Sequence, residues 1–393
     1  MIGVLETQLG TALCCLVPRY DKDKIRIRIF DVRNYQIRRF IPAILILALA
    51  PYGCATTSVV NPQSCVLDPV AKYAKTKRVP GLAVAIAAKG ELAVVHEYGF
   101  SELSEAIPIQ ALESKFRIGS TSKSLTAFLI AKLHQDERID IDEPIVSYLP
   151  ELDTSFEETT IRQLAGHLGG VRHYSEMSEL GNTKEYATTA DALSIFIDDA
   201  LVSAPGETFS YSTYGYTLLS AVLERATGES FLSLMEDEVT EPLGLANTVP
   251  DTQNIKVPER TEFYYLGEDG NYVVGDTINS SYKWAGGGYL STAVDLANFG
   301  MAHFDDSILD NSSRELLWTS QKTTSGLATD YGIGWFIRDG WVEHPGGALG
   351  GTTLLRIYPS EGIVVAIAAN LSMRGPDPLD PLPAQLFECA KNL

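Results

Sequence analysis

Strand-like segments lie at both ends of this chain, and helix-like segments fill its middle. Near the N-terminal side, two apolar runs flank the turn Lys89-Gly90-Glu91, as in a β-hairpin. Further β-rich runs, separated by Gly and Pro turns, lie between residues 331 and 372. A sheet built from two ends of a chain encloses whatever lies between them. The sequence therefore predicts an α/β fold of the α+β type, an antiparallel sheet with an inserted all-helical lobe.

The expected helices fall into two groups. Terminal helices over 65–80 and 383–393 should flank the sheet, the first of them ended by Pro80. Helical patterns in the middle of the chain cover residues 121–136, 159–168, 189–201 and 214–239. Clefts between such a sheet and such a lobe commonly hold active sites.

The charge of the chain excludes one class of partner. The net charge is −19, and no basic stripe occurs beyond the first fifty residues. Phosphate contacts need clustered Lys and Arg, so we expect no nucleic-acid partner. Apolar residues at 45% and charged residues at 21% are ordinary for a globular protein.

Residues 1–53 form a separate N-terminal extension, and we expect the main domain to span residues 66–393. The extension holds eight Lys/Arg against four Asp/Glu. Its apolar run Ile41–Ala50 follows "RRF" and precedes Gly53-Cys54, which resembles a bacterial lipoprotein signal with Cys54 lipidated. The alternative is an uncleaved N-terminal membrane anchor. Either reading predicts a membrane-anchored protein of the cell envelope, on the periplasmic side. Translation starting near Val32 would explain why the signal begins so late.

Two of the five cysteines stand near the ends of the expected domain. In an oxidising compartment Cys65 and Cys389 could form a disulfide that joins the two ends, and two unrelated thiols are the alternative. No Cys-x-x-Cys or His-x-His spacing indicates a metal site.

The stretch "RIGSTSKSLTA" places Ser120 and Lys123 at the start of an apolar helix. Ser120 could simply cap that helix. A cap prefers Glu or Gln three residues later, whereas Lys123 stands there and opposes the helix dipole. A second Ser-x-x-Lys match, Ser280 to Lys283, precedes the glycines of "WAGGGYL" and is expected to open no helix.

The spacing of Ser120 and Lys123 has a chemical use. Positions i and i+3 share a helix face, so the amine can approach the hydroxyl. Burial and the positive helix end both lower the pKa of a lysine. A neutral amine could then accept the serine proton as a general base. A P-loop is excluded, because Ser122 stands where that motif needs glycine.

"FRIGSTSKSLTA" resembles the nucleophile segment of the penicillin-binding-protein and class C β-lactamase superfamily. Further segments that resemble the same superfamily are "TTIRQLAGHLGGVRHY", "PGETFSYSTYGYTLLSAVLERATG", "AGGGYLSTAVDLANF" and "EHPGGALG". The chain is most similar to the branch of mitochondrial serine β-lactamase-like proteins and their bacterial relatives, which shares "YST" and "HLxGxRHY". The resemblance implies a β-lactamase/transpeptidase-like fold.

The resemblance makes Tyr211 a proton-transfer residue in the family's Tyr-x-Asn motif. A free Tyr titrates near pH 10, so we expect a nearby cation such as Lys123 to lower its pKa. Thr213 replaces the Asn of the motif. Because Thr offers one short hydroxyl instead of an amide, recognition of a β-lactam side-chain amide becomes doubtful.

"HPGG" stands where the family places Lys-Thr-Gly or His-x-Gly. The resemblance implies that Gly346 lets the backbone approach the substrate, and that the N–H groups of Ser120 and Gly347 form an oxyanion hole. His344 would replace the usual Lys, be mostly neutral at pH 7 and bind a substrate carboxylate weakly. Residues expected to matter less are a decoy motif at Lys322–Thr324 and two structural histidines, His167 and His173.

Together these features predict a serine hydrolase that forms an acyl-Ser120 intermediate with peptide substrates (D-amino-acid or small peptide) or with esters. A β-lactamase and a non-catalytic cell-envelope binding protein are the alternatives. The expected partner is a small-molecule or peptide substrate. The chemistry needs no metal and no organic cofactor, because Lys and Tyr supply the proton transfers.

Overall fold

The computed structural model describes residues 64–253, 256–275, 277–373, 375 and 377–393. The predicted signal or anchor segment and Cys54 lie outside these residues, so the envelope location stays a prediction. Within the described residues, no helix combines the length and apolar character needed to cross a membrane.

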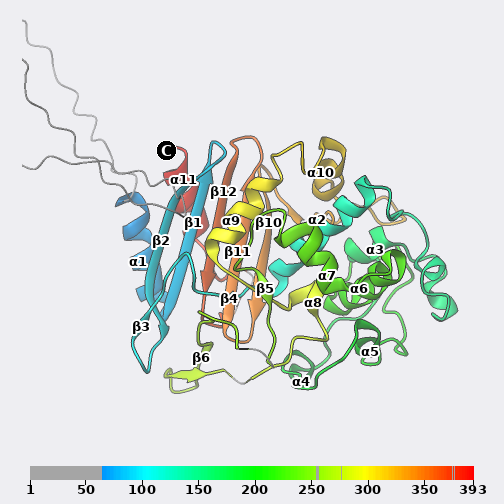
Figure 1. Cartoon of the computed structure of the whole chain (residues 1–393), viewed down its shortest axis with the longest axis horizontal. Helices are drawn as coiled ribbons and strands as arrows, with labels where there is room; N and C mark the ends of the chain where they lie inside the picture. The colour runs from blue at the N-terminus through cyan, green and yellow to red at the C-terminus, as the bar shows by residue number, and fades with distance from the viewer. Residues whose placement is uncertain (1–63, 254–255, 276, 374, 376) are drawn as a thin grey trace, which may run out of the picture. The chain divides into compact units, whose positions relative to one another are not determined.

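The main sheet is built from both ends of the domain, as the sequence predicts (Figure 1). Its strands lie in the order β3-β2-β1-β12-β11-β10-β9, and neighbouring strands pair antiparallel. Leu82 pairs with Ala369, which joins the first strand to the last one. The strand bounds are β1 Gly81–Ala88, β2 Glu91–Glu102, β3 Ile107–Pro108, β9 Phe336–Ile337, β10 Val342–Ala348, β11 Gly351–Tyr358 and β12 Ile363–Ala369.

The two faces of the sheet belong to different hydrophobic cores. Side chains alternate along a strand, so Leu82 and Val84 enter one core while Ala83 and Ala85 enter the other. The terminal helices α1 (Ser64–Lys77) and α11 (Leu382–Ala390) cover the first face, where Cys65 and Cys389 form a disulfide. That finding confirms the pairing considered from the sequence.

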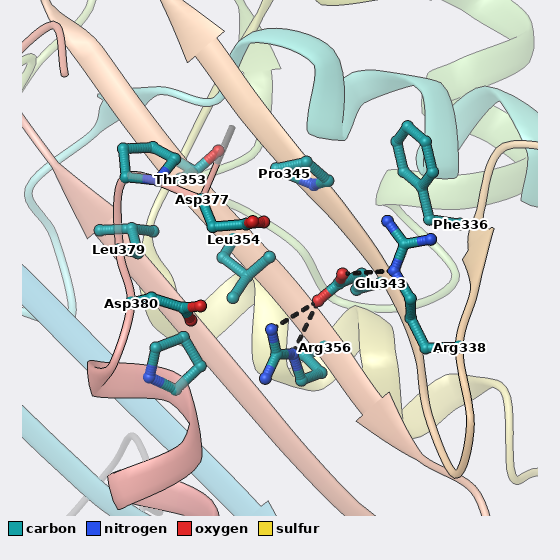
Figure 2. Close-up of a pocket in the computed structure, with 12 residues that line it drawn as sticks. Phe336, Arg338, Glu343, Pro345, Thr353, Leu354, Arg356, Asp377, Leu379 and Asp380 are labelled. Atoms are coloured by element: carbon teal, nitrogen blue, oxygen red, sulfur yellow. Dashed lines mark hydrogen bonds and ion pairs between the residues drawn. The ribbon is translucent and has the colours of Figure 1, made fainter. Parts of the chain in front are cut away.

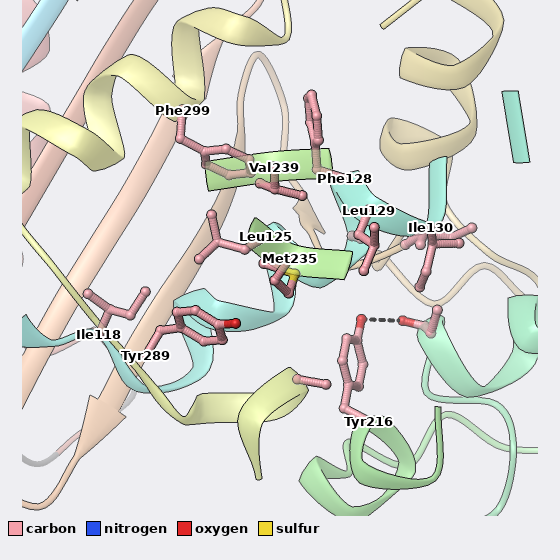
Figure 3. Packing of buried hydrophobic residues seen from close by; sticks show 14 of the residues in the cluster. Ile118, Leu125, Phe128, Leu129, Ile130, Tyr216, Met235, Val239, Tyr289 and Phe299 are labelled. Carbon is pink, nitrogen blue, oxygen red and sulfur yellow. Dashed lines mark hydrogen bonds between the residues drawn. The ribbon is translucent and has the colours of Figure 1, made fainter. Parts of the chain in front are cut away.

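The second face packs against α9 (Ala293–Ala302) and the helical lobe (Figure 1). Figure 3 shows how Phe128 and Leu125 of α2 (Ser122–Gln135) meet Phe299 of α9. In the same core Tyr216 donates a hydrogen bond to the carbonyl of Ala165, so its phenol is satisfied although wholly buried.

The lobe consists of short helices, and its bounds differ in part from the prediction. The segment 189–201 is helical only at its start, and the segment 214–239 divides into three pieces. The remaining helical bounds are α3 Ile161–Ala165, α4 Met177–Leu180, α5 Thr189–Leu193, α6 Thr213–Thr227, α7 Phe231–Met235 and α10 Asn311–Trp318, with short turns η2 Ile145–Ser147, η3 Thr154–Phe156 and η4 Glu236–Thr240.

A small antiparallel sheet ties the start of the domain to its middle. It joins β4 (Phe116–Arg117) to β8 (Tyr289–Ser291), which also pairs with β5 (Val249–Pro250). The pairing sets the nucleophile segment, which follows β4, beside α8 (Trp284–Gly287), which precedes β8. A separate hairpin consists of β6 (Tyr264–Leu266) and β7 (Tyr272–Val274).

Candidate active site

Ser120 is the opening in an otherwise buried segment. From Ser114 to Ala131 it is the one residue that is not classed as buried. It lies in a 3₁₀ turn, η1 (Gly119–Thr121), that leads directly into α2. Thr121, the residue before α2, makes no side-chain capping bond. A hydroxyl that caps nothing and reaches solvent from a rigid, buried segment is placed for chemistry on an incoming molecule.

Lys123 lies wholly buried directly behind Ser120. Its Nζ is 3.3 Å from Ser120 Oγ, which confirms that the amine approaches the hydroxyl although Ser120 lies in the turn before α2. The same nitrogen donates to Thr213 Oγ1 at 3.1 Å and to the carbonyl of Gly286 at 2.6 Å. Burial above all, and then the charge of Lys283, hold the pKa of Lys123 well below its usual value. These are the conditions under which a lysine amine is neutral and can accept a proton.

Tyr211 completes the group, but its electrostatics differ from the prediction. Lys123 Nζ lies 4.8 Å from the centre of the Tyr211 ring, so the amine faces the ring. Burial raises the pKa of Tyr211, and the Ser120 hydroxyl beside it only partly opposes that effect. The expected lowering by Lys123 is therefore wrong, because a neutral amine supplies no charge to stabilise a phenolate. Tyr211 is a phenol at neutral pH.

Two histidines fix the backbone that carries Tyr211. Ser212 N–H donates to His167 Nδ1, and Thr213 N–H donates to His173 Nδ1, each at 3.2 Å. An imidazole nitrogen that accepts a hydrogen bond must be unprotonated. Burial, aided by Lys123, lowers the pKa of His173 to about 4 and that of His167 well below its usual value. This bonding agrees with the structural role expected for both residues.

Thr213 faces inward. Its side chain is 3% exposed, and its hydroxyl accepts the Lys123 bond. Ser212 caps α6 by accepting from Gly215 N–H, so Thr213 is the first residue of that helix. The Thr213 hydroxyl is therefore hydrogen-bonded to Lys123 and buried, so it does not reach a surface where a substrate could bind.

The strand β10 brings its glycines against the turn that carries Ser120. A Cβ at Gly346 would lie 1.9 Å from the carbonyl oxygen of Ile118, and one at Gly119 would lie 2.5 Å from the carbonyl oxygen of Gly347. Gly119 also has a φ of +49°, which L side chains rarely adopt. Gly347 itself is exposed. The contacts put the exposed Gly347 backbone next to the Ser120 turn.

His344 is wholly buried beneath this strand. Its Nδ1–H donates to the Pro345 carbonyl at 2.8 Å, and its Nε2 accepts from the Tyr331 hydroxyl at 3.1 Å. Burial, with Lys123 second, lowers the pKa of His344 to about 3. The imidazole is neutral, as expected. With both nitrogens engaged, it supports the β10 backbone from below and does not reach the exposed surface.

A pocket of about 260 Å³ lies on the other face of β10 (Figure 2). Glu343 lines it and pairs with Arg356 at 2.7 Å and Arg338 at 3.1 Å. These three charges are thus paired with one another, and the lining of the pocket includes neither Ser120 nor Lys123.

Sequence reasoning missed two contributions to the site. The carbonyl of Gly286 fixes Lys123, and Lys283 affects its pKa. Both lie in "SYKWAGGG", where the second Ser-x-x-Lys match was set aside. Ser280 itself lies in a loop, as expected, whereas Lys283 is the N-cap of the short helix α8. By contrast, Lys322 of the decoy third motif is exposed on a loop.

Comparisons with known proteins agree with this architecture. The Beta-lactamase family model matches residues 68–386. The human mitochondrial serine beta-lactamase-like protein LACTB is 26% identical over 408 aligned residues, covering 75% of this chain and 74% of that protein. Penicillin-binding protein 4 of Amycolatopsis lactamdurans is 29% identical, covering 74% of this chain and 81% of its own length.

Solved structures show the same fold. The octameric penicillin-binding protein homologue from Pyrococcus abyssi superimposes with a TM-score of 0.70 at 23% identity, covering 84% of this chain and 78% of that one. The D-amino acid amidase from Ochrobactrum anthropi gives a TM-score of 0.71 at 23% identity, covering 84% and 98%. The fold and family expected from the motifs are confirmed: the chain belongs to the Beta-lactamase family of serine hydrolases.

Proposed function

We propose that this protein hydrolyses small peptides or esters through an acyl-Ser120 intermediate. The proposal is supported above all by one observation, a solvent-open serine hydroxyl 3.3 Å from a buried amine whose pKa is strongly lowered. Such an amine accepts a proton near neutral pH without prior loss of its own. A purely structural lysine in this position would be expected to carry a carboxylate partner, whereas Lys123 bonds only to neutral oxygens.

The acylation step follows from these contacts. Ser120 Oγ attacks the substrate carbonyl carbon while its proton passes to Lys123 Nζ. The carbonyl electron pair moves to oxygen, where the amides of Ser120 and Gly347 stabilise the negative charge. As the intermediate collapses, the leaving amine or alkoxide takes a proton relayed from Lys123 through the Tyr211 phenol. Tyr211 acts as a relay and not as a phenolate base, because burial raises its pKa.

Deacylation repeats the same transfers with water. A water molecule attacks the acyl carbon and loses its proton toward Tyr211 and Lys123. Ser120 Oγ then leaves and regains a proton, which restores the resting state.

The surroundings favour a peptidase or esterase over an efficient β-lactamase. Thr213 is committed to Lys123, and His344 is neutral and buried. Neither provides the amide or the cation expected for a β-lactam side chain and carboxylate.

Covalent labelling tests the nucleophile. We expect a fluorophosphonate probe to label the protein, and the label to be absent in Ser120→Ala. Lys123→Met should slow labelling by about 100-fold or more, the usual contribution of a general base. Lys132→Met is the matched control, since Lys132 is a surface residue paired with Asp136.

A substrate panel then separates the activities. Purified protein is assayed with D-Ala peptides, p-nitrophenyl esters and nitrocefin, each against Ser120→Ala. Turnover of peptides or esters with little nitrocefin hydrolysis supports the proposal. An unlabelled Ser120 and no turnover of any of the three would favour a non-catalytic binding protein instead.

A further inference from the structure

Lys283 is a second buried lysine beside the site, and it lacks a polar partner. Its side chain is 3% exposed. Among the described residues its Nζ has no hydrogen bond or ion pair, and it faces the Tyr282 ring, whose centre lies 5.1 Å away. Buried lysines are rare unless paired. The nitrogen is not fully sealed from solvent.

The charges around Lys283 leave a positive excess. In the part of the chain that the structure describes, Asp251 is the acidic group whose charge acts on it, and Asp251 already pairs with two arginines. Its carboxylate lies 2.7 Å from Arg117 and 3.3 Å from Arg260. Arg117 is itself 3% exposed and keeps one buried nitrogen, Nη2, without a partner. Within the described residues, Lys283, Arg117 and Arg260 thus lie around one carboxylate, that of Asp251.

This excess lies next to the nucleophile. Lys283 directly precedes α8, whose Gly286 carbonyl holds Lys123. A Cβ on Gly287 would be 3.6 Å from Gly119, so α8 touches the Ser120 turn. On the other side, Arg117 Nη1 donates to the carbonyl of Leu349, two residues beyond Gly347. Lys283 therefore adjoins α8, and its neighbour Arg117 contacts the segment just after Gly347.

We infer that Lys283 is a specificity-determining residue that binds a carboxylate of the substrate. The inference rests on the proposed function and names the substrate class, namely anionic esters or peptides. A carboxylate would supply the missing counter-ion without displacing any internal bond. It would also supply the recognition that the neutral, buried His344 does not. Burial and Arg117 lower the pKa of Lys283 to about 7, and a bound carboxylate would favour its charged form.

Paired esters test the inference. Mono-p-nitrophenyl glutarate and p-nitrophenyl pentanoate have equal chain length and differ by one terminal carboxylate. In Lys283→Met we expect the ratio of their kcat/KM values, anionic over neutral, to fall about tenfold or more, the scale of a lost charge-assisted hydrogen bond. Lys283→Arg should keep most of the ratio, and Lys132→Met all of it. A second pair, 3-acetoxybenzoate and 3-acetoxybenzamide, places the carboxylate on the leaving group.

The outcomes separate the two proposals. A fall of the ratio in either pair supports Lys283 as the anion-binding residue. Unchanged ratios in both pairs, or equal losses for anionic and neutral esters, overturn that role. If wild-type protein fails to turn over the neutral esters, or if Ser120→Ala retains the activity, the proposed function itself fails. Because the readout is a ratio within one preparation, partial misfolding of a variant does not change it.

Discussion

At Ser120 the chain turns from wholly buried to open and back again within three residues. This turn requires glycine at position 119, because the residue has a positive φ and a Cβ there would collide with the Gly347 backbone. A side chain there would have to push β10 away from the nucleophile. Because Gly119 has no Cβ, the Ser120 hydroxyl and the proposed oxyanion donor at Gly347 can lie next to each other.

Gly119→Ala should abolish most activity and destabilise the fold. The added Cβ would meet Gly347 oxygen at 2.5 Å and would also occupy an unfavourable φ. Gly90→Ala is the matched control, because its φ is +81° but nothing lies within 4 Å. We expect Gly90→Ala to cost about 1 kcal/mol, the penalty of a left-handed residue alone, with labelling of Ser120 unchanged. Urea unfolding and fluorophosphonate labelling measure both effects, and equal losses in the two variants would contradict this account.

The proximity of Ser120 and Lys123 and the lowered pKa of the lysine could be predicted from the sequence, because both follow from local spacing and burial. The sequence did not predict the raised pKa of Tyr211, which depends on how much solvent the fold removes around the ring. Nor could it assign Lys283, since the unpaired state of that amine depends on which cations already occupy Asp251, 32 positions earlier in the chain.

Among the elements, the start of α6 depends on a segment some forty residues earlier. His167 accepts from Ser212 N–H, and its ring lies 4.2 Å from that of Tyr211. His167 holds a φ of 60°, a conformation that costs energy in a non-glycine residue and recurs at functional sites. The strain is maintained because the imidazole both supports the Tyr211 ring and satisfies a buried donor.

His167→Leu should therefore destabilise the protein by about 1–3 kcal/mol, because Ser212 N–H would remain buried without an acceptor. His167→Asn provides a comparison, since Asn tolerates a positive φ and keeps a side-chain acceptor. We expect a smaller loss of stability for Asn than for Leu in urea unfolding, and slower labelling of Ser120 in the Leu variant. The reverse order of stabilities would show that ring packing, not the hydrogen bond, dominates.

Element boundaries were predictable where one face of a segment is apolar. The hairpin at Lys89-Gly90, the helix α2 and the terminal helices follow from such patterns. The segment 189–201 failed because its apolar residues pack as a turn after Leu193, and periodicity does not distinguish a turn from a further helical turn. The strand β9 is only two residues long, and before it Gly332 and Gly334 lie so close to the backbone of Leu317 and Lys123 that a side chain would not fit.

For the whole molecule, buried neutral histidines make stability depend on pH. Burial lowers the pKa of His303 to about 4 and that of His344 to about 3. A folded-state pKa below the unfolded value of 6.5 means that the unfolded chain binds protons first as pH falls. Stability is thus lost progressively from pH 6.5 down to these values. Unlike His344, His303 is remote from the proposed chemistry, so it isolates the effect.

His303→Phe should flatten this dependence. Its ring packs among Phe128, Phe299 and Trp335, so an aromatic substitute keeps much of the contact. Between pH 6 and 4, the slope of unfolding free energy against pH should fall by about 1.4 kcal/mol per pH unit, the value for one proton. Urea titrations at several pH values measure the slope, and identical slopes in both proteins would refute the assignment.

The disulfide between Cys65 and Cys389 closes a loop of 324 residues in sequence separation. Removing a native cross-link of this kind costs about 3–5 kcal/mol. We expect the double variant Cys65→Ser/Cys389→Ser to melt at a lower temperature, with ester turnover retained at 25 °C. The bond lies with α1 and α11 on the face of the sheet away from Ser120. Loss of turnover at an unchanged melting temperature would contradict this separation.

The division of the sheet into two independent faces makes the molecule easy to attach to a support. Leu67 on α1 is 43% exposed, and it stands on the side of the sheet away from Ser120. A chemical handle at this position would fix the protein to a bead or sensor while leaving Ser120 turned toward the solution, so that captured substrates could be read without blocking their entry.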